Sequence, residues 1–254
     1  MSNLNTHFVG KVLLPFEELD STQTYAQNLL SRSRPAEGTL VTASSQSSGK
    51  GLLHNRWESA PGQNLLLSLI LYPDFLPLSR AFLLSQAMAL GVRDWAHRYA
   101  GARARVKWPN DLYIGDKKAG GILIQNAVSG KHIGHSVVGI GINVNQTVFP
   151  PELPNPGSIK GETGLELDLK MALNELCECI EQRYLDLREG EWLAIQEEYL
   201  RQLYGFGETR TFLRPDGKPF SGKITGVLEN GYLQLQTDKG LESFEVKEIQ
   251  LKLI

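Results

Sequence analysis

The residues best suited to chemistry lie near the middle of the chain, where Lys107-Trp108-Pro109-Asn110-Asp111 is followed by Lys118. Between them, Gly115-Asp116 places a glycine first in a two-residue turn, which predicts a type II′ hairpin. In that hairpin Tyr113 pairs with Lys118, and Asp111 lies on the same face two residues further along. We therefore expect Asp111 and Lys118 to converge. The residues alone leave two readings open: a surface ion pair that contributes little, or part of a nucleotide–metal site.

A second candidate is the loop from Gln46 to Trp57, which is rich in serine and glycine and carries the cations Lys50 and Arg56. Glycines let backbone N–H groups approach a ligand closely, and lysine or arginine side chains complement phosphate or carboxylate. Loops of this composition often close over ligands. Taken alone, a solvated loop is an equally good interpretation.

Three sequence patterns suggest a nucleotide, phosphate or metal site, but each is better explained as ordinary structure. Gly139-Ile140-Gly141 lacks the third glycine of a dinucleotide fingerprint, so we interpret these glycines as small residues inside a strand. Gly49-Lys50-Gly51 lacks the ending of a phosphate-binding Walker loop. His132 and His135 lie three residues apart in a predicted strand, so their side chains point to opposite faces and do not form a metal pair.

The hydrophobic pattern predicts the elements that must position these residues. The expected strands up to the centre of the chain are Val12–Phe16, Thr39–Ala43, Leu65–Leu71, Arg105–Trp108, Asp111–Ile114, Lys117–Gln125 and one ending near Asn143. The central strands read as an antiparallel meander. Helices are expected from Asp20-Ser21-Thr22, where short polar side chains can cap the first turn, and over Ser79–Tyr99, Leu169–Leu187 and Glu191–Leu203.

Beyond Gly205 the pattern changes to short strands, with Asn230-Gly231 as a strong hairpin signal. The expected strands are Thr209–Leu213, Gly222–Leu228, Tyr232–Gln236, Glu242–Val246 and Ile249–Ile254. We therefore predict a small barrel-like domain. The predicted division places one domain over residues 1–205 and the second over residues 206–254.

The composition narrows the class of protein. The chain has 254 residues and a formal net charge of −2, so it has no overall basic field for nucleic acid. Its two cysteines, Cys177 and Cys179, form neither a disulfide framework nor a usual zinc pattern. We find no apolar run of the ~20 residues that cross a bilayer and no signal-peptide core at the N-terminus. A cytoplasmic protein without a membrane partner is expected.

Together, several segments resemble the catalytic domain of biotin–protein ligases, in the same order along the chain. They are Asp20-Ser21-Thr22, the loop from Gln46 to Trp57, Pro61-Gly62-Gln63-Asn64-Leu65, Lys107 to Tyr113, Lys118 to Leu123, and Gly139 to Val144. The resemblance implies an α/β (α+β) fold, in which helices flank a mostly antiparallel sheet of the class II synthetase type, followed by an SH3-like barrel. Only about ten residues precede the catalytic domain that the resemblance implies, so we expect the ligase-only form without a DNA-binding module.

The resemblance also implies a two-step reaction. Biotin attacks the α-phosphate of ATP to form biotinyl-5′-AMP and pyrophosphate, and a lysine of a biotin carboxyl carrier domain then displaces AMP. Magnesium would accompany ATP, held mainly by phosphates and water rather than by protein ligands. Both monomers and homodimers occur in the family, so either state is expected.

Roles for individual residues follow from the same resemblance. Lys118 would be catalytic, stabilising charge between the biotin carboxylate and the α-phosphate. Together with Lys118, the residues expected to bind biotin are Ser21, Thr22, Gln46, Gly49, Lys50 and Gly120. The residues expected to bind the nucleotide are Lys50, Arg56, Trp57, Asn110, Asp111, Asn143 and Lys252.

The chain departs from the family in its loop, which usually reads Gly-Arg-Gly-Arg-x-Gly-Arg-x-Trp. Lys50, Leu52 and Asn55 replace the three arginines, and His54 replaces a glycine. We therefore hypothesise that the loop holds biotinyl-AMP less tightly than arginine-rich relatives do. Ala119-Gly120 also replaces the usual Leu-Ala, with an expected effect on packing alone.

Two alternative functions stay open on the sequence. One is a lipoate–protein ligase or octanoyltransferase, which shares the catalytic fold. The other is a non-catalytic biotin sensor. Binding of biotin against lipoate separates the first, and ATP-dependent turnover separates the second.

Overall fold

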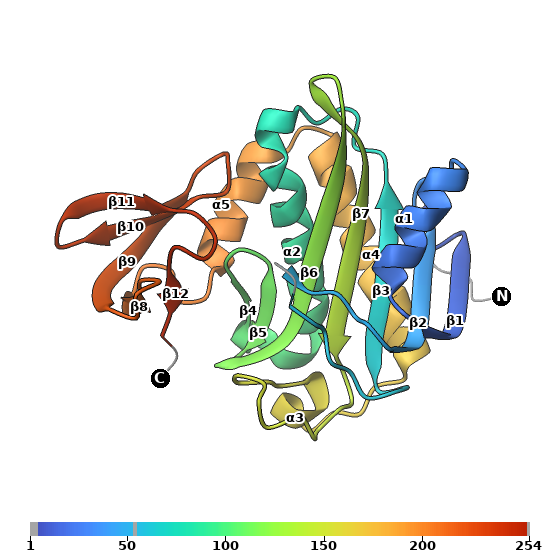
Figure 1. The fold of residues 1–254 in the computed structure, drawn as a ribbon, viewed down its shortest axis with the longest axis horizontal. Coiled ribbons are helices and arrows are strands. Elements are labelled where there is room, and N and C mark those ends of the chain that lie inside the picture. Colours follow the sequence, from blue (N-terminus) through green and yellow to red (C-terminus); the bar gives the residue numbers. More distant parts are fainter. Residues whose placement is uncertain (1–4, 53–54, 253–254) are drawn as a thin grey trace.

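The computed structural model describes residues 5–52 and 55–252. Seven strands form a sheet in the order β1-β2-β3-β7-β6-β5-β4, in which β1 and β2 are parallel and the other neighbours antiparallel (Figure 1). The strands are β1 (Leu13–Leu19), β2 (Leu40–Gln46), β3 (Asn64–Leu71), β4 (Ala104–Lys107), β5 (Asp111–Ile114), β6 (Lys117–Ser129) and β7 (His132–Asn143). The predicted mostly antiparallel sheet is confirmed.

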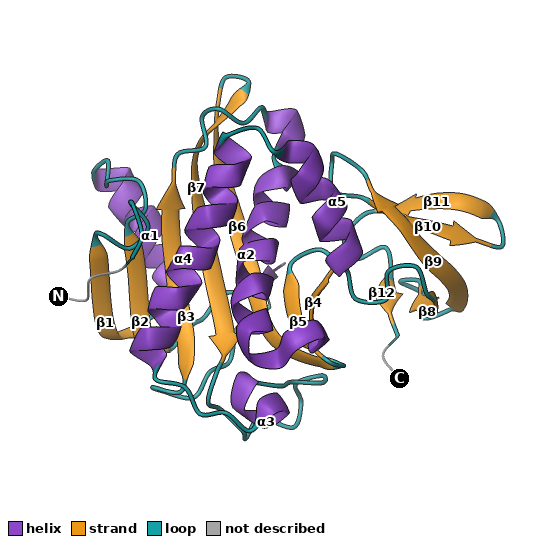
Figure 2. Cartoon of the chain, turned by 180° about the vertical axis from the view of Figure 1, so that it is seen from behind, coloured by secondary structure: helices purple, strands orange, loops and turns teal. Residues whose placement is uncertain are grey.

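Helices cover both faces of this sheet. Helix α1 (Thr22–Arg32) packs on one face, and α2 (Phe82–Ala100) and α4 (Leu169–Arg188) lie across the other, as Figure 2 shows from behind. Helix α5 (Trp192–Gln202) leads from α4 toward the C-terminal strands. The short α3 (Ile159–Thr163) follows the loop after β7. The chain therefore forms three layers, with α1 on one face of the sheet and α2 and α4 on the other.

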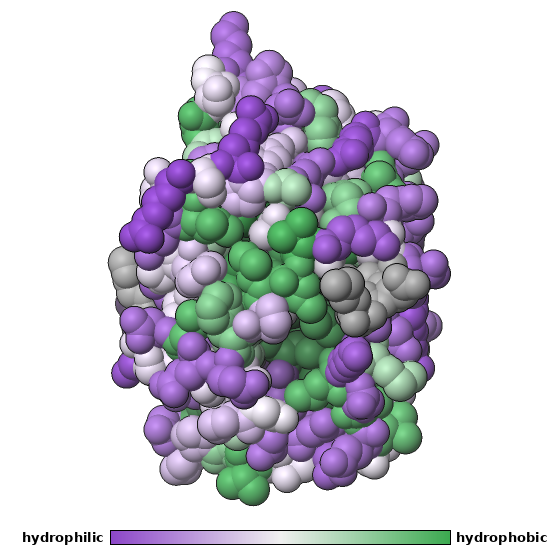
Figure 3. All heavy atoms as spheres, turned by 90° about the vertical axis from the view of Figure 1, so that its right-hand side faces the viewer, coloured by the Kyte–Doolittle hydropathy of each residue, from purple (hydrophilic) through white to green (hydrophobic). Residues whose placement is uncertain are grey.

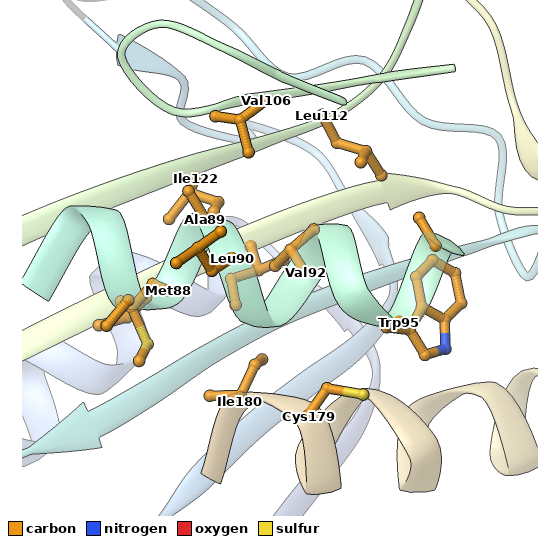
Figure 4. Packing of buried hydrophobic residues seen from close by; sticks show 14 of the residues in the cluster. Met88, Ala89, Leu90, Val92, Trp95, Val106, Leu112, Ile122, Cys179 and Ile180 are labelled. Atoms are coloured by element: carbon orange, nitrogen blue, oxygen red, sulfur yellow. The ribbon is translucent and has the colours of Figure 1, made fainter. Parts of the chain in front are cut away.

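The main core lies between α2, α4 and the sheet. Figure 4 shows Met88, Leu90 and Trp95 of α2 between strand residues such as Val106 on one side and Ile180 of α4 on the other. A Cβ atom at Gly91 would lie 3.0 Å from the Cα of Ile180. Glycine at this position therefore lets the two helices approach closely, which brings their apolar faces together against the sheet.

Five strands at the end of the chain form a second, antiparallel sheet in the order β11-β10-β9-β8-β12. They are β8 (Thr209–Leu213), β9 (Pro219–Val227), β10 (Leu233–Thr237), β11 (Gly240–Phe244) and β12 (Gln250–Leu251). The predicted Asn230-Gly231 turn lies between β9 and β10, where Gly231 has φ 90°. This second sheet is compatible with an SH3-like domain, and the boundary after residue 205 stays a prediction.

The sequence misplaced several element ends. Helix α2 begins at Phe82 rather than Ser79, because Leu78–Arg80 form a 3-10 turn instead. Strand β6 continues to Ser129, four residues beyond Gln125, since it pairs with β7 along this length. The sequence did not predict α3, whose five residues are too few to show a helical period. The expected last strand shortens to β12, and Ile254 lies outside the described residues.

Strand β1 forms one edge of the main sheet, and its surroundings are apolar. Figure 3 looks onto this side and shows hydrophobic residues gathered in a hollow, framed by hydrophilic ones. Val12, which precedes β1, is 42% exposed, and Phe16 is partly exposed. Pro15 lies within the strand, where it has no N–H to offer a further strand. The edge is therefore poorly suited to continuous pairing with another chain.

Among residues 5–52 and 55–252, every helix is too short or too polar to cross a lipid bilayer.

Candidate active site

A cavity lies between the main sheet, the loop after β2 and the C-terminal sheet. Apolar side chains of the second sheet, including Phe212, Ile224 and Leu233, form part of its lining. Nine of the predicted site residues line it: Ser21, Thr22, Gln46, Lys50, Arg56, Trp57, Asn110, Asp111 and Lys118. Residues from the first 60 and from positions 107–118 are thus brought into one space.

Lys118 and Asp111 meet across the hairpin as predicted. The Nζ atom of Lys118 lies 2.7 Å from Oδ1 of Asp111, and both side chains are partly buried. Tyr113 pairs with Lys118, and Gly115 adopts φ 57° in the turn. The ion pair faces the cavity, so the carboxylate fixes the position of the ammonium group where a ligand can reach it.

Lys107 is a second partly buried lysine beside this pair. It pairs with Asp111 between β4 and β5, and its Nζ lies 5.2 Å from the centre of the Tyr113 ring. Burial lowers the pKa of Lys107; Asp111 opposes that shift, and the positive charge of Lys118 adds to it. The sequence pattern contained this lysine, but we had given it no role of its own.

The charge of the cavity is strongly asymmetric. Five cationic side chains are among its described lining residues, whereas Asp111 is the one carboxylate there. The cations are Lys50, Arg56, Lys107, Lys118 and Lys247. A site lined in this way attracts a polyanion, because the protein supplies too few carboxylates to neutralise its own positive charge.

The loop after β2 is held by its own backbone. Lys50 and Arg56 form an antiparallel bridge, the Gly51 N–H donates to the Asn55 carbonyl at 2.7 Å, and the Trp57 N–H donates to the Gly49 carbonyl at 3.0 Å. The Arg56 guanidinium donates to the Ser47 carbonyl at 3.0 Å. Gly49 does not line the cavity, but a Cβ there would lie 2.5 Å from the Trp57 carbonyl oxygen. The substitution at His54 falls outside the described residues.

Trp57 packs flat against glycines of the sheet. A Cβ at Gly141 would lie 2.5 Å from Cε2 of Trp57, and one at Gly121 would lie 3.3 Å from its Cζ3. The interpretation of Gly141 as a small strand residue is confirmed, with the added reason that the indole occupies its missing side chain. The indole Nε1 is buried without a hydrogen-bond partner among the described residues.

A polar cluster lies at the start of α1. Ser21 caps the helix by accepting from the Thr24 N–H, and the Thr22 N–H donates to Oε1 of Gln46 at 2.7 Å. The Thr22 hydroxyl lies 2.9 Å from that of Ser68, and Ser68 also contacts Gln23. The sequence patterns assign no role to Ser68 or Gln23. The available signal was a lone serine inside the apolar run of β3.

Asn143 and Asn110 support backbone next to the site. Asn143 does not line the cavity; its Nδ2 donates to the Gly157 carbonyl at 2.9 Å, and the Gly157 N–H donates to the Lys118 carbonyl at 2.9 Å. Asn143 thus holds the loop that holds the backbone of Lys118. Asn110 lines the cavity, and its Nδ2 donates to the Ile122 carbonyl.

Two more predicted residues stand apart from the cavity. Gly120 has no place in its lining, since a Cβ there would face Leu112 and the backbone of Gly141. Lys252 is exposed, and its backbone N–H donates to the Thr211 carbonyl at 2.9 Å. Their ligand roles therefore stay predictions without support from the lining of this cavity.

The model of the biotin/lipoate A/B protein ligase family matches residues 16–143 of the chain. The chain belongs to this family. The match begins within β1, ends with β7 and includes every cavity residue named above from the main sheet.

Individual members of the biotin/lipoate ligase family resemble most of the chain. The bifunctional ligase/repressor BirA of Bacillus subtilis is 33% identical over 251 residues, which cover 98% of this chain and 76% of that protein. A biotin–[acetyl-CoA-carboxylase] ligase of Paracoccus denitrificans is 28% identical, covering 82% of this chain and 88% of its own. The solved biotin protein ligase of Aquifex aeolicus in complex with biotin and ATP has a TM-score of 0.78 and 26% identity, over 96% of this chain and 100% of that one. The expected family and fold are confirmed.

The cavity offers few side chains that could coordinate a metal ion. The described residues contain no group of three or more His, Cys, Asp or Glu side chains able to hold one. Asp111, the carboxylate of the cavity lining, already pairs with Lys118. These residues fit a cation that arrives with phosphates and keeps most of its water, and they do not fit a metal cage.

Proposed function

We propose that this protein is an ATP-dependent biotin–protein ligase that forms biotinyl-5′-AMP and transfers biotin to a lysine of a carrier protein. One observation carries the proposal: a single cavity combines a neutral, hydrogen-bonding end at Ser21, Thr22 and Gln46 with a cationic end at Lys118. Biotin has the matching form, with a neutral cyclic urea at one end and a carboxylate at the other. The ligase names of the relatives support the same reading.

In the proposed first step, Lys118 lies between the biotin carboxylate and the α-phosphate of ATP. Its ammonium group is oriented by Asp111 at 2.7 Å, so no reorganisation is needed when negative charge develops on the reacting oxygens. In the second step the carrier lysine amine attacks the carbonyl carbon of biotinyl-5′-AMP, the C–O bond to AMP breaks, and the amine loses a proton as the amide forms, while Lys118 stabilises the charged oxygens again. The biotin roles of Gly49, Lys50 and Gly120 belong to this proposal.

The nucleotide is proposed to lie against Trp57, on the side of the ring away from Gly141. Lys50 and Arg56 of the loop would complement its phosphates, and Asn110, Asp111, Asn143 and Lys252 keep the roles that the resemblance implies. Magnesium would arrive with ATP and be held mainly by phosphate oxygens and water. When bound, it would neutralise charge on the departing pyrophosphate.

The finer assignments are also proposals. We infer that the acceptor is a biotin carboxyl carrier domain, that the enzyme acts in the cytoplasm as a monomer or homodimer, and that residues 206–254 form the second domain. Two free cysteines support a reducing compartment. Burial raises the pKa of the Cys177 thiol to about 12 and that of Cys179 to about 11, so neither is activated as a nucleophile.

The test is to incubate the protein with biotin, magnesium-ATP and a biotin carboxyl carrier domain and to follow the mass of the carrier. Wild type is expected to add one biotin, and Lys118→Ala to reduce both this rate and pyrophosphate release by about 100-fold or more. Lys117→Ala is the matched control, because Lys117 is exposed and does not line the cavity.

Each other result has a distinct meaning. Pyrophosphate release without a gain in carrier mass would support the adenylation step and reject that carrier. Release of no pyrophosphate with biotin, but modification of a carrier with lipoate, would replace the proposal by the lipoate-type activity. Biotin binding without any turnover would replace it by a sensor.

A further inference from the structure

Beneath the neutral end of the cavity, Thr22, Ser68 and Gln23 form a chain of buried hydrogen bonds. The Thr22 and Ser68 hydroxyl oxygens lie 2.9 Å apart, and Oγ of Ser68 lies 3.1 Å from Oε1 of Gln23. The three residues are 4%, 0% and 3% exposed, so water does not compete for these groups. A Cβ at Gly139 would lie 2.6 Å from Oε1 of Gln23. The glycine therefore makes room for this amide.

The hydrogen bonds of Gln23, at the far end of this row of hydrogen bonds, fix which groups donate and which accept. Nε2 of Gln23 donates to the Val137 carbonyl at 3.1 Å and to Oε1 of Gln125 at 2.8 Å. A backbone carbonyl can only accept, so the amide of Gln23 cannot be turned around. Its oxygen therefore faces Ser68 and requires a donor. The one hydrogen of the Ser68 hydroxyl goes to this oxygen, which leaves Ser68 able only to accept from Thr22.

Thr22 must then be the donor in its contact with Ser68. The Thr22 hydroxyl oxygen also lies 3.1 Å from Oε1 of Gln46, but its contact with Ser68 is shorter, at 2.9 Å, and with the Ser68 hydrogen used on Gln23 only Thr22 can supply the hydrogen of that contact. Oε1 of Gln46 also already accepts the Thr22 N–H at 2.7 Å. With its one hydrogen used on Ser68, the Thr22 oxygen presents only lone pairs to the cavity.

We propose that Gln23 and Ser68 are positioning residues that make Thr22 a fixed hydrogen-bond acceptor, so that the cavity selects a ring carrying an N–H group at this point. The inference rests on the proposed function, in which the cyclic urea of biotin occupies this end. If an oxygen or sulfur atom replaces that N–H, its lone pairs face the lone pairs of the Thr22 oxygen. The buried Thr22 acceptor then has no donor. The hydrogen-bonded row of Gln23, Ser68 and Thr22, called the relay below, therefore discriminates between rings of the same shape.

The test compares biotin with its two cyclic carbamate analogues, in each of which one ureido N–H is replaced by oxygen. Calorimetry gives the dissociation constant of each ligand for the full-length protein. Wild type is expected to bind one of the carbamates roughly 100-fold more weakly than biotin. Ser68→Ala removes the acceptor of the Thr22 hydrogen, which can then turn toward the cavity as well as toward Oε1 of Gln46, and the discrimination is expected to fall about tenfold.

Gln23→Met is the second variant, because it removes the acceptor of the Ser68 hydroxyl and lets Ser68 donate to Thr22. It should reduce the same discrimination about tenfold, and the double variant should lose no more than either single one, since the residues act as one unit. Ser136→Ala is the matched control: Ser136 is also 0% exposed, but it donates to Asn126 and does not line the cavity.

The outcomes separate the two proposals. If wild type binds none of the three ligands, the proposed function fails and this inference fails with it. If wild type discriminates while Ser68→Ala and Gln23→Met weaken biotin and carbamate equally, the relay alone is overturned, because a merely structural role lowers both affinities together. A loss of discrimination in Ser136→Ala equal to that in Ser68→Ala would overturn it as well.

Discussion

Among single residues, Lys107 lowers the stability of the folded protein but contributes positive charge to the site. Its ammonium group is partly buried next to Lys118, and this burial lowers its pKa. A folded-state pKa below the ordinary value means that the unfolded chain binds the proton more strongly. Stability therefore increases as the pH rises from the folded pKa of Lys107 toward 10.5. The retained charge has a use, since it adds to the positive field that attracts a polyanionic nucleotide.

Replacing Lys107 with methionine is expected to stabilise the protein and weaken the enzyme. At pH 7 the melting temperature should rise by roughly 2 °C, and this gain should shrink as the pH approaches 10.5. The KM for ATP should increase about tenfold. Melting curves and initial rates measure both effects, with the exposed Lys117→Met as control. A gain in melting temperature that stays constant from pH 7 to pH 10 would contradict the argument.

Among the elements, β6 and β7 provide the surface on which Trp57 packs, because Gly121 and Gly141 leave space for its ring. Gly141→Ala would place a Cβ 2.5 Å from the indole, so the ring must leave the sheet. We expect about tenfold weaker ATP binding or more, together with a changed tryptophan emission spectrum. Gly134→Ala, also in β7 but outside the cavity lining, should change neither. Unchanged ATP binding in Gly141→Ala would show that the indole does not cover the nucleotide.

The loop between β2 and β3 permits a second prediction at this scale. Leu52 and Asn55 line the cavity at the two positions where the resemblance to biotin–protein ligases implies arginine. The double substitution Leu52→Arg with Asn55→Arg should slow the release of biotinyl-AMP by roughly tenfold, because two charged forks are restored beside the phosphate. Release is followed by filter binding. Val148→Arg, at an 82% exposed position, adds charge away from the cavity. Equal or faster release from the double variant would reject the hypothesis of a weakened loop.

At the scale of the whole molecule, the C-terminal sheet is joined to the motif that carries Asp111. The Trp108 indole donates to the Gly231 carbonyl at 2.9 Å, and the Tyr199 hydroxyl donates to the Pro109 carbonyl at 2.6 Å. Gly231 itself packs on the ring of Phe82, since a Cβ there would lie 2.6 Å away. The turn between β9 and β10 therefore fixes the segment that orients Lys118.

Trp108→Phe should lower kcat about tenfold by loosening this segment. It should also lower the melting temperature by about 3 °C, the effect of one lost hydrogen bond. Trp192→Phe is a close control, because its indole also donates to a backbone carbonyl, that of Leu187, at 2.9 Å. The control should lose similar stability and keep its kcat. Equal losses of kcat in the two variants would show that the contact with Gly231 has no special link to catalysis.

Local rules were enough for much of this protein. The pairing of Tyr113 with Lys118 followed from one glycine-first turn. The meeting of Lys118 and Asp111 was also predicted and is confirmed, although a register shift between Leu112 and Tyr113, which no local rule indicated, sets Asp111 opposite Gly121. The helix start at Ser21 followed from side-chain capping. The resemblance to a known family added the fold, the two substrates and the expected roles of individual residues.

Only the tertiary structure decided which distant residues meet. Ser68 and Gln23 are 45 positions apart, and the stacking of Trp57 on Gly141 spans 84 positions. Neither contact has a local signal, because each depends on the register of β3 against β7 and on where α1 and the loop pack. Asn143 and Gly120 lie outside the cavity lining for the same reason. Sequence alone determined the chemistry that was available; packing determined which groups share a buried space, since burial and hydrogen-bond direction arise only when separate elements close on one another.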